Sequence, residues 1–212
     1  DTPSPIYTLT PEEKLAGWRL LFDGQNNYGL RGLTHNDFIN RGWKINHGTL
    51  FCEKAIKDMG LVTGGHLITA EQFDNFEFSW EWKLSVSGKS GIMYLVSGTR
   101  QEPVGFTYSI MDDTRHPDGL KGGPIRHSGA LYNLIPAPDP KAKKLEEPGQ
   151  WNKGRILVLG NHIEHWLNEV KVVEYDLGSP ELQKALVTAT TAKPPLLKPD
   201  RLLGKKFKTA IV

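Results

Sequence analysis

The chain of 212 residues is poor in cysteine, in long apolar stretches and in net charge. Its single cysteine, Cys52, excludes an internal disulfide, and its place after Leu50 and Phe51 predicts a small, buried apolar side chain. No apolar stretch is long enough to cross a bilayer, so we expect no transmembrane segment. The length is that of one domain with a substantial core, and we expect a single domain over residues 1–212.

The charge balance offers no general attraction to nucleic acid. Lysine and arginine number 26 against 24 acidic residues, which leaves a formal net charge of +2. The basic residues form two short runs, at 141–144 and 205–208, and we interpret both as solvated surface. We therefore expect no nucleic-acid partner.

The first residues are polar and contain prolines. Residues 1–8 have the character of a spacer that remains after a leader has been removed. This predicts a periplasmic or secreted protein, including a lipoprotein whose leader has been removed. The near-absence of cysteine is compatible with that location but does not require it.

The clearest pattern that is present belongs to β-strands. Residues 76–84 alternate strictly, with apolar side chains at Phe76, Phe78, Trp80 and Trp82 and polar ones between them. That period of two predicts a half-buried strand with these aromatic residues facing the core. Further apolar segments of five to nine residues lie between turns, and residues 129–135 are one of them. We predict an all-β sandwich with more than twice as much strand as helix.

Helical signals are confined to the two ends. Thr10 is followed by proline and, three residues later, by Glu13, which predicts a short N-terminal helix with a capping box. Residues 18–22 then predict a strand, and residues 180–192 predict a second helix. Two long loops, 112–128 and 136–150, are where functional residues on a rigid sandwich are expected.

Several motifs together resemble the 3-keto-disaccharide hydrolase-like family. The resemblance spans roughly residues 18–175 and keeps the order and spacing of the family's motifs. The matching stretches are Phe73-Asp74-Asn75-Phe76-Glu77-Phe78, Glu81-Trp82-Lys83, Gly88-Lys89-Ser90-Gly91-Ile92, Tyr108 to Asp113, His116-Pro117-Asp118, Ser128-Gly129-Ala130-Leu131-Tyr132, Gly149-Gln150-Trp151-Asn152 and Gly160-Asn161-His162-Ile163-Glu164-His165-Trp166-Leu167-Asn168.

The resemblance implies a fold and an activity. The fold is a concanavalin A-like β-sandwich, a jelly roll of two antiparallel sheets, here with a short N-terminal helix. The activity is the cleavage of glycosides whose sugar carries a ketone at C3, by secreted, periplasmic or lipoprotein members. The implied partner is therefore a carbohydrate.

The chain departs from the family pattern in two places. Where the family commonly has Glu-Tyr-Gln, this sequence has Thr107, Tyr108 and Ser109, so a carboxylate and an amide are absent. The family's closing Gly-x-Ile-x-Leu-Gln-x-His-Gly element has no clear match in residues 194–212. A non-catalytic carbohydrate-binding module on the same sandwich is the alternative.

A C3 ketone offers a route for cleavage, because it acidifies the proton on C2. A base can then form an enolate that expels the C1 substituent, after which water adds. Such a mechanism needs a base, a donor or metal for the enolate oxygen, and an acid for the leaving group. Histidine and carboxylate side chains suit these roles.

The catalytic candidates are Glu81, Asp113, His116 and His165. Glu81 lies on the polar face of its strand and could serve as acid or base, or form an ion pair with Lys83. The acidic and imidazole groups from Asp112 to Asp118, which follow the apolar segment 106–111, could bind a divalent cation, orient a sugar or simply cap a turn. We name no metal ligands, and no cofactor is certain.

The substrate-binding candidates are Tyr94, Tyr108, Arg126, Tyr132, Glu164 and Trp166. In residues 162–168 the alternation places Glu164 and Trp166 on one face, as a sugar platform or an ordinary solvent face, and His165 on the other. The pattern favours a core position for His165, whereas its chemistry makes it a catalytic candidate. The tyrosines are equally compatible with a sandwich core.

Overall fold

The computed structural model describes residues 6–33, 42–53, 65–98 and 103–191. The chain divides into two compact units, the first with its described residues between 6 and 72 and the second with residues 73–98 and 103–191. Each unit is considered by itself. The single domain expected over residues 1–212 stays a prediction.

The first unit has one short helix and two small sheets. Helix α1, Pro11–Leu15, begins with the predicted capping box: the Thr10 hydroxyl accepts from the Glu13 amide, and the Glu13 carboxylate accepts from the Thr10 amide. Strand β1, Leu30–Gly32, pairs with β4, Leu67–Thr69, and β2, Trp43–Asn46, pairs with β3, Thr49–Cys52.

Two expectations for the first unit are wrong. Residues 18–22 form no strand. Cys52 is exposed rather than buried, because it ends a two-stranded hairpin whose last two residues face solvent. Phe51 and Cys52 point to opposite faces of the strand and are both exposed, so the apolar triplet does not mark a core here.

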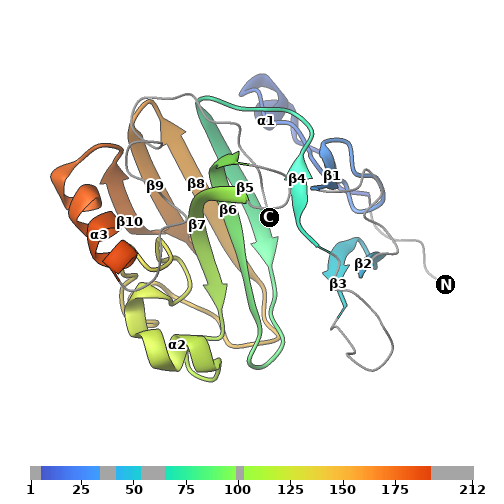
Figure 1. Ribbon diagram of the computed structural model, residues 1–212. Helices are drawn as coiled ribbons and strands as arrows, with labels where there is room; N and C mark the ends of the chain where they lie inside the picture. Colours follow the sequence, from blue (N-terminus) through green and yellow to red (C-terminus); the bar gives the residue numbers. More distant parts are fainter. Residues whose placement is uncertain (1–5, 34–41, 54–64, 99–102, 192–212) are drawn as a thin grey trace. The chain divides into compact units, whose positions relative to one another are not determined.

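The second unit is a β-sandwich (Figure 1). One sheet has the order β10-β9-β8-β5, and β6 pairs with β7 in a second sheet that crosses one face of the first. All pairings are antiparallel. The strands are β5 Phe76–Trp82, β6 Lys89–Gly98, β7 Pro103–Met111, β8 Asn152–Leu159, β9 His162–Leu167 and β10 Val170–Asp176. The fold class predicted from the sequence is confirmed, including the excess of strand over helix in the described residues.

The predicted register of β5 is confirmed. Trp82 is buried, Phe76 and Trp80 pack against the core, and the half-buried Phe78 ring stacks on Trp80 with centroids 5.1 Å apart. The Tyr108 ring of β7 makes a T-shaped contact with Trp80, with centroids 4.9 Å apart. This face of the four-stranded sheet is therefore turned toward β6 and β7, and we call the opposite face, with Glu81, the outer face.

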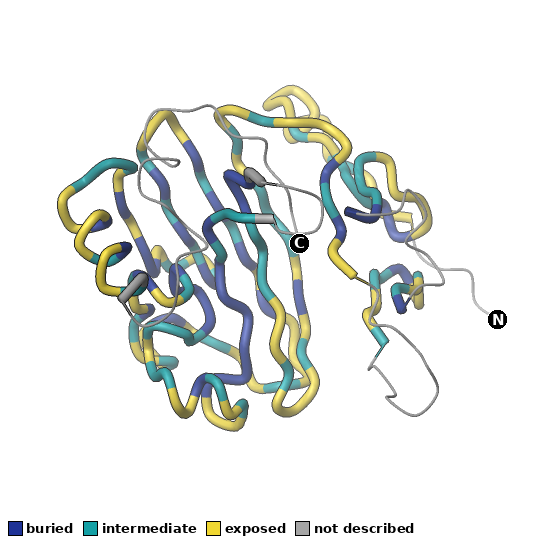
Figure 2. The backbone as a smooth tube through the Cα atoms, in the orientation of Figure 1, coloured by how far each residue is buried: buried dark blue, intermediate teal, exposed yellow. Residues whose placement is uncertain are grey.

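The core fills the space between the two sheets. Tyr94, Phe106 and Tyr108 come from β6 and β7, and they meet Ile156, Ile163 and other apolar residues of the four-stranded sheet. Figure 2 shows the buried positions alternating with less buried ones along the central strands. Burying a large apolar side chain contributes roughly 1.5–3 kcal/mol, so the many members of this layer together stabilise the sandwich.

The helices of the second unit flank the sheets. Helix α3, Pro180–Thr191, confirms the predicted second helix and places Leu182 and Leu186 in the core. Helix α2, Pro117–Gly122, and the 3-10 turn η2, Gly123–Ile125, lie within the long loop 112–128. No helix in the described part of the chain has the length and apolarity needed to span a membrane.

The segment 129–135 is not the strand that its apolar residues predicted. It forms turns, and two isolated bridges join Leu131 to Tyr108 and to Ile135. Gly129 has φ +85°, and a Cβ there would lie 2.8 Å from the Val172 side chain. Glycine thus allows the chain to turn tightly against β10 before it runs beside β7.

Candidate functional site

The two aspartates that follow β7 are structural groups in the interior. Asp112 and Asp113 are both 4% exposed. One oxygen of Asp112 accepts from the Ser87 amide at 2.9 Å, and one oxygen of Asp113 accepts from the Ser128 amide at 2.7 Å. Both carboxylates therefore fix loops, which is the turn-capping role weighed for them from the sequence.

Asp113 is also half of a buried ion pair. The Lys143 ammonium lies 2.6 Å from the second Asp113 oxygen and donates to the Ser128 carbonyl at 2.9 Å. The Lys143 side chain is fully buried, so interpreting residues 141–144 as solvated surface is wrong at this position. The paired carboxylate is the physical reason, because it compensates a lysine charge that would otherwise not be removed from water.

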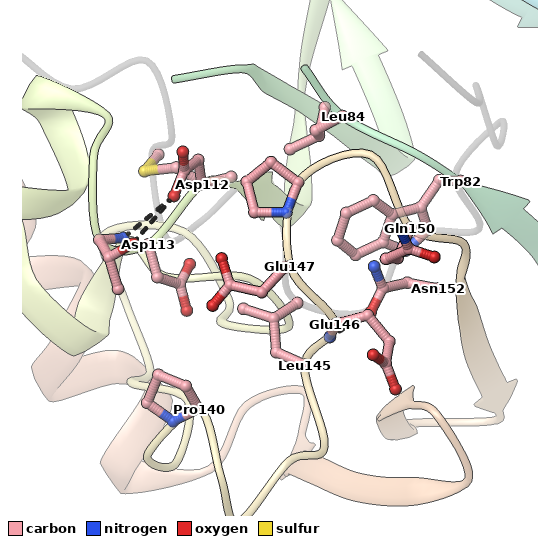
Figure 3. A pocket seen from close by; sticks show the side chains of 13 residues that line it. Trp82, Leu84, Asp112, Asp113, Pro140, Leu145, Glu146, Glu147, Gln150 and Asn152 are labelled. Carbon is pink, nitrogen blue, oxygen red and sulfur yellow. Dashed lines mark hydrogen bonds between the residues drawn. The ribbon is translucent and has the colours of Figure 1, made fainter. Parts of the chain in front are cut away.

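A pocket opens beside Asp113. Figure 3 shows Asp112, Asp113 and Glu147 on one side of it and Trp82 and Gln150 on another. The Trp82 indole Nε1 is buried without a hydrogen-bond partner in the structure, so this wall offers one unused donor. Both aspartates are engaged by backbone amides, Asp113 is also paired with Lys143, and Glu147 is paired with Arg115, so these three carboxylates of the pocket are not free for acid–base work.

A second polar group gathers around Asp118 at the start of α2. Its carboxylate accepts from Lys89 and Arg126, one on each oxygen, and from the Tyr132 hydroxyl at 2.6 Å. Lys89 also donates to the Tyr132 oxygen at 3.1 Å and lies over its ring. We call these four residues the Asp118 cluster. Their side chains are partly exposed, so a ligand can reach them.

The Asp118 cluster lies on the side of β6 and β7 that faces away from the four-stranded sheet. Lys89 alternates with the core-facing Ile92 and Tyr94 along β6. The Arg126 carbonyl accepts from the Ser109 hydroxyl at 2.6 Å, and Ser109 alternates with the core-facing Tyr108.

Thr107 and Ser109, the positions where the sequence departs from the family pattern, share this side. Thr107 is half-buried, and its carbonyl accepts from the Tyr132 amide at 2.9 Å. Residues 194–212, which lack the family's closing element, lie outside the described residues.

His116 acts first as a helix cap. Its Nδ1 accepts from the Asp118 amide at 3.0 Å, at the N-terminus of α2. A neutral imidazole that accepts at Nδ1 carries its proton at Nε2. In this arrangement His116 offers a donor rather than a base.

The charges of the Asp118 cluster reinforce one another. Partial burial by itself would raise the pKa of the Asp118 carboxyl, but hydrogen bonds from Lys89 and Tyr132 and the nearby charges hold it well below its usual range. The same contacts raise the pKa of Lys89, although its partial burial opposes this. The cluster therefore keeps two cations and one anion at neutral pH.

His165, Tyr94 and Tyr108 are in the core rather than at a surface, and all three are fully buried. The His165 Nδ1 lies 2.9 Å from the Gly129 carbonyl, so Nδ1 carries the proton, and Nε2 accepts from the Tyr94 hydroxyl at 2.6 Å. Tyr94 in turn lies 2.6 Å from the Tyr175 hydroxyl. The Tyr108 hydroxyl donates to the Trp166 carbonyl at 3.0 Å. These groups satisfy each other and are not available to a substrate.

Glu164 and Trp166 lie on the outer face, as the alternation predicted. The Trp166 indole donates to Glu164 at 2.7 Å, and the Arg155 guanidinium lies 4.0 Å above the Trp166 ring. Arg155 also pairs with Glu77 at 2.9 Å. Glu81 is exposed on the same face, opposite Lys153 in the neighbouring strand.

The sequence-predicted residues therefore do not meet at one cleft. His116, Arg126 and Tyr132 belong to the Asp118 cluster or touch it. The other candidates are divided between the interior and the outer face: Asp113, His165, Tyr94 and Tyr108 in the first, Glu81, Glu164 and Trp166 in the second. The two accessible groups are separated by both sheets of the sandwich.

Sequence reasoning missed three residues that the structure brings into these groups: Lys89, Lys143 and Arg155. Lys89 stands within the Gly88–Ile92 motif, so its signal was present as part of the resemblance. Nothing in the run 141–144 distinguishes Lys143 from its neighbours before the loop is folded.

Among the described residues, the acidic and imidazole groups between Asp112 and Asp118 do not form a cation site. Asp112, Asp113 and Asp118 each bind different partners, and His116 faces a backbone amide. In the described part of the chain, ligand atoms of three such groups come within 4.8 Å of one another only at His162, Glu164 and Glu174.

Comparisons with known proteins agree on a family. The sequence profile of the 3-keto-alpha-glucoside-1,2-lyase-like domain matches residues 17–196. A 3-keto-disaccharide hydrolase of Bacteroides thetaiotaomicron is 34% identical over 175 residues, which cover 76% of this chain and 59% of that protein. The chain thus spans about three fifths of the length of this relative.

Two crystal structures from Parabacteroides distasonis, both of candidate glycosyl hydrolases, have a similar fold. The first has a TM-score of 0.76 at 23% identity and covers 97% of this chain and 91% of its own. The second has a TM-score of 0.60 at 27% identity, with coverages of 76% and 72%. The family profile covers more than half of the chain, across the boundary between the two units.

Proposed function

Because this chain belongs to the family of 3-keto-alpha-glucoside-1,2-lyase-like domains, we propose that it cleaves glycosides whose sugar carries a ketone at C3. The observation that carries the proposal is the accessible Asp118 cluster, in which Lys89, Asp118 and Tyr132 come from the family's motifs and Arg126 joins them. Support also comes from the relative named 3-keto-disaccharide hydrolase. The reaction takes place outside the cytoplasm in this proposal.

The proposed reaction is an elimination followed by hydration. A base removes the C2 proton, the electrons of that C–H bond delocalise onto the C3 oxygen, and the resulting enolate expels the C1 oxygen substituent. The leaving group takes up a proton, and water then adds across the enone. The net change is hydrolysis of the glycosidic bond, with neither oxidation nor reduction.

The Asp118 cluster suits the negative charge that develops on the C3 oxygen. Lys89 and Arg126 supply two cations, and they are held in place by the carboxylate between them before substrate arrives. Preorganised donors of this kind stabilise a transition state more than a ground state. Asp118 itself is a weak base because its pKa is held well below the usual range, with the Lys89 and Tyr132 hydrogen bonds outweighing partial burial.

Tyr132 and His116 are the donors nearest to this charge. The Tyr132 hydroxyl donates to Asp118 and accepts from Lys89, so it can protonate a leaving oxygen while Lys89 compensates the phenolate charge. The Nε2 proton of His116 is a further donor. In this proposal Tyr132 and His116 act as proton donors, and neither removes the C2 proton.

A carbohydrate-binding module without catalysis is the second candidate. One observation favours it. Thr107 and Ser109 lie on the side of β7 that carries the Asp118 cluster, and at these two positions the family commonly has a carboxylate and an amide. Loss of that carboxylate removes a natural base while leaving the hydrogen-bonding groups in place. In that case sugar would bind and remain intact.

One experiment separates these candidates. The protein is incubated with trehalose and with 3-keto-trehalose, and released monosaccharide is measured. We expect cleavage of the keto sugar alone, because only the ketone acidifies C2. Equal cleavage of both sugars contradicts the elimination mechanism, and binding without release supports the module.

Single substitutions test whether the Asp118 cluster carries out the reaction. Lys89→Met and Tyr132→Phe should each lower kcat by about 10²- to 10³-fold, as expected for the loss of one transition-state donor. Lys121→Met and Tyr28→Phe are matched controls, because both side chains are exposed and outside the cluster. If all four variants keep wild-type kcat, the cluster is not the site.

A further inference from the structure

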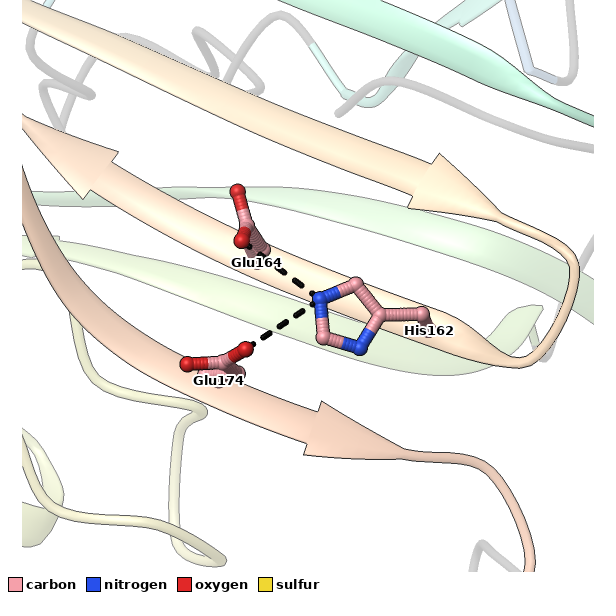
Figure 4. Close-up of side chains that lie close together, drawn as sticks. All are labelled: His162, Glu164 and Glu174. Atoms are coloured by element: carbon pink, nitrogen blue, oxygen red, sulfur yellow. Dashed lines mark hydrogen bonds and ion pairs between the residues drawn. The ribbon is translucent and has the colours of Figure 1, made fainter.

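His162, Glu164 and Glu174 converge on the outer face of the sandwich. His162 and Glu164 belong to β9 and Glu174 to the neighbouring β10 (Figure 4). The His162 Nε2 lies 3.4 Å from one Glu164 oxygen, Oε1, and 3.3 Å from Glu174 Oε1. These three atoms lie within 4.8 Å of one another.

The spacing is that of ligands around a small transition-metal ion. Zinc binds histidine nitrogen and carboxylate oxygen at about 2.0–2.2 Å, so a tetrahedral site separates neighbouring ligand atoms by about 3.3–3.5 Å. Both nitrogen–oxygen separations fall in that range. We propose that His162, Glu164 and Glu174 bind a divalent transition-metal ion of the zinc class.

Each proposed ligand is oriented from its far side. The His162 Nδ1 lies 3.0 Å from Asp176, which is the carboxylate–histidine arrangement that directs Nε2 toward a metal. Glu164 Oε2 accepts from the Trp166 indole at 2.7 Å, and Glu174 Oε2 accepts from Lys171 at 2.6 Å. All three ligand atoms are thereby turned toward one point between the strands.

The sheet itself fixes the ligands. Glu164 and Glu174 are direct cross-strand partners, and His162 is two residues along the same face of β9. Contacts with Trp166, Lys171 and Asp176 already restrict part of the side-chain freedom of the three ligands before an ion binds. Such preorganisation favours binding.

Lys171 is the group that competes with the ion. Its ammonium lies 3.1 Å from Glu164 Oε1, one of the proposed ligand atoms, and 2.6 Å from Glu174 Oε2. The flexible lysine can leave Glu164 and keep its contact with Glu174, whose Oε2 is not a proposed ligand atom. A bound cation then replaces the Lys171–Glu164 contact and the two contacts of His162 Nε2, and it leaves the Lys171–Glu174 and His162–Asp176 contacts in place.

The ligand set selects among metals. An imidazole nitrogen with two carboxylates suits zinc or manganese, whereas calcium and magnesium take oxygen ligands and more of them. Three protein ligands leave a fourth position open to water or to a ligand oxygen. This site lies across the sandwich from the Asp118 cluster and does not rest on the proposed function.

Calorimetric titration tests the proposal with tag-free protein and zinc chloride, and with calcium chloride as the comparison metal. We expect one zinc ion per chain and no calcium binding at the same concentration. His162→Gln and Glu174→Gln should each weaken zinc binding at least 100-fold. Asp176→Asn should weaken it about 10- to 100-fold, the usual effect of losing an orienting partner.

Two further measurements keep the test decisive. His66→Gln is the matched control, because His66 is exposed and outside the site, and it should bind zinc like the wild type. Zinc should raise the thermal midpoint of the wild type but not of His162→Gln, and far-ultraviolet circular dichroism checks that each variant is folded. Absence of zinc binding by the wild type, or equal binding by His162→Gln, overturns the proposal.

Discussion

The two faces of strand β9 carry the same kinds of side chain in opposite surroundings. His165 faces the core, where it is fully buried between one tyrosine hydroxyl and one backbone carbonyl. His162, three residues earlier, faces solvent, where Glu164, Glu174 and Asp176 all lie within ion-pair distance. Around His165 the interior gives each ring nitrogen one fixed partner, whereas the outer face shares several partners among its groups.

This difference follows from the cost of removing polar groups from water. A buried donor or acceptor must be paired, so Tyr175, Tyr94, His165 and Gly129 form a chain without spare capacity. Exposed groups can exchange a partner for water at little cost. Substitutions of the interior groups should therefore lower the free energy of unfolding. Substitutions of the exposed groups should instead weaken reversible ligand binding.

The buried ion pair gives the largest expected contrast. Lys143→Met leaves the Asp113 carboxylate buried without its cation, and loss of one partner of such a pair costs about 3–5 kcal/mol. Urea unfolding measures the change. Lys141→Met is the control, because Lys141 is exposed, and it should change the free energy of unfolding by less than about 0.5 kcal/mol. Similar values for the two variants would mean that burial of Lys143 does not decide its contribution.

The pH dependence of stability should report the buried histidine. Burial lowers the pKa of His165 from 6.5 to about 4, although the hydrogen bond to Gly129 opposes the shift. The unfolded chain then binds the proton more readily, so the contribution is fully present above pH 6.5 and is lost as the pH falls toward 4. The loss amounts to about 3 kcal/mol over this window, since each pKa unit corresponds to about 1.4 kcal/mol.

His165→Gln provides the comparison for this slope. Glutamine can donate to the Gly129 carbonyl and accept from Tyr94, but it does not titrate. The free energy of unfolding, measured by urea between pH 7 and 5 with chelator present, should fall more steeply for the wild type than for the variant. Parallel curves would show that His165 is not the titrating group.

Removing a single hydroxyl from the interior chain should have a smaller effect. Tyr94→Phe leaves the Tyr175 hydroxyl and the His165 Nε2 without partners, and an unsatisfied buried group costs about 1–3 kcal/mol. We expect a loss of about 2 kcal/mol in urea unfolding. His162→Gln on the outer face should change stability by less than about 0.5 kcal/mol in metal-free buffer. Equal losses would remove the distinction between the two faces of β9.

The sequence predicted those features that depend on neighbours along the chain. The alternation in β5 and β9 placed Trp82 and His165 inside and Glu164 and Trp166 outside, because a strand turns successive side chains to opposite faces. The capping box at Thr10 is equally local. The resemblance supplied the family and the fold class.

The features that depend on contacts between distant segments were not predictable in this way. Lys143 is buried because Asp113, 30 residues earlier, lies beside it in the fold. Residues 129–135 form turns because Gly129 must pass Val172. The candidate site residues divide between the interior, the outer face and the Asp118 cluster, because packing of the aromatic side of β5 against β7 leaves its polar side on the outer face.

Glu81 gives the smallest expected effect and tests that division. It is exposed on the outer face, opposite Lys153, whereas the Asp118 cluster lies beyond β6 and β7. Glu81→Gln should therefore keep the kcat for 3-keto-trehalose within a factor of about two and the free energy of unfolding within about 0.5 kcal/mol. The measurement runs beside Lys89→Met, whose activity should fall. Loss of turnover in Glu81→Gln with unchanged stability would instead move the catalytic site to the outer face.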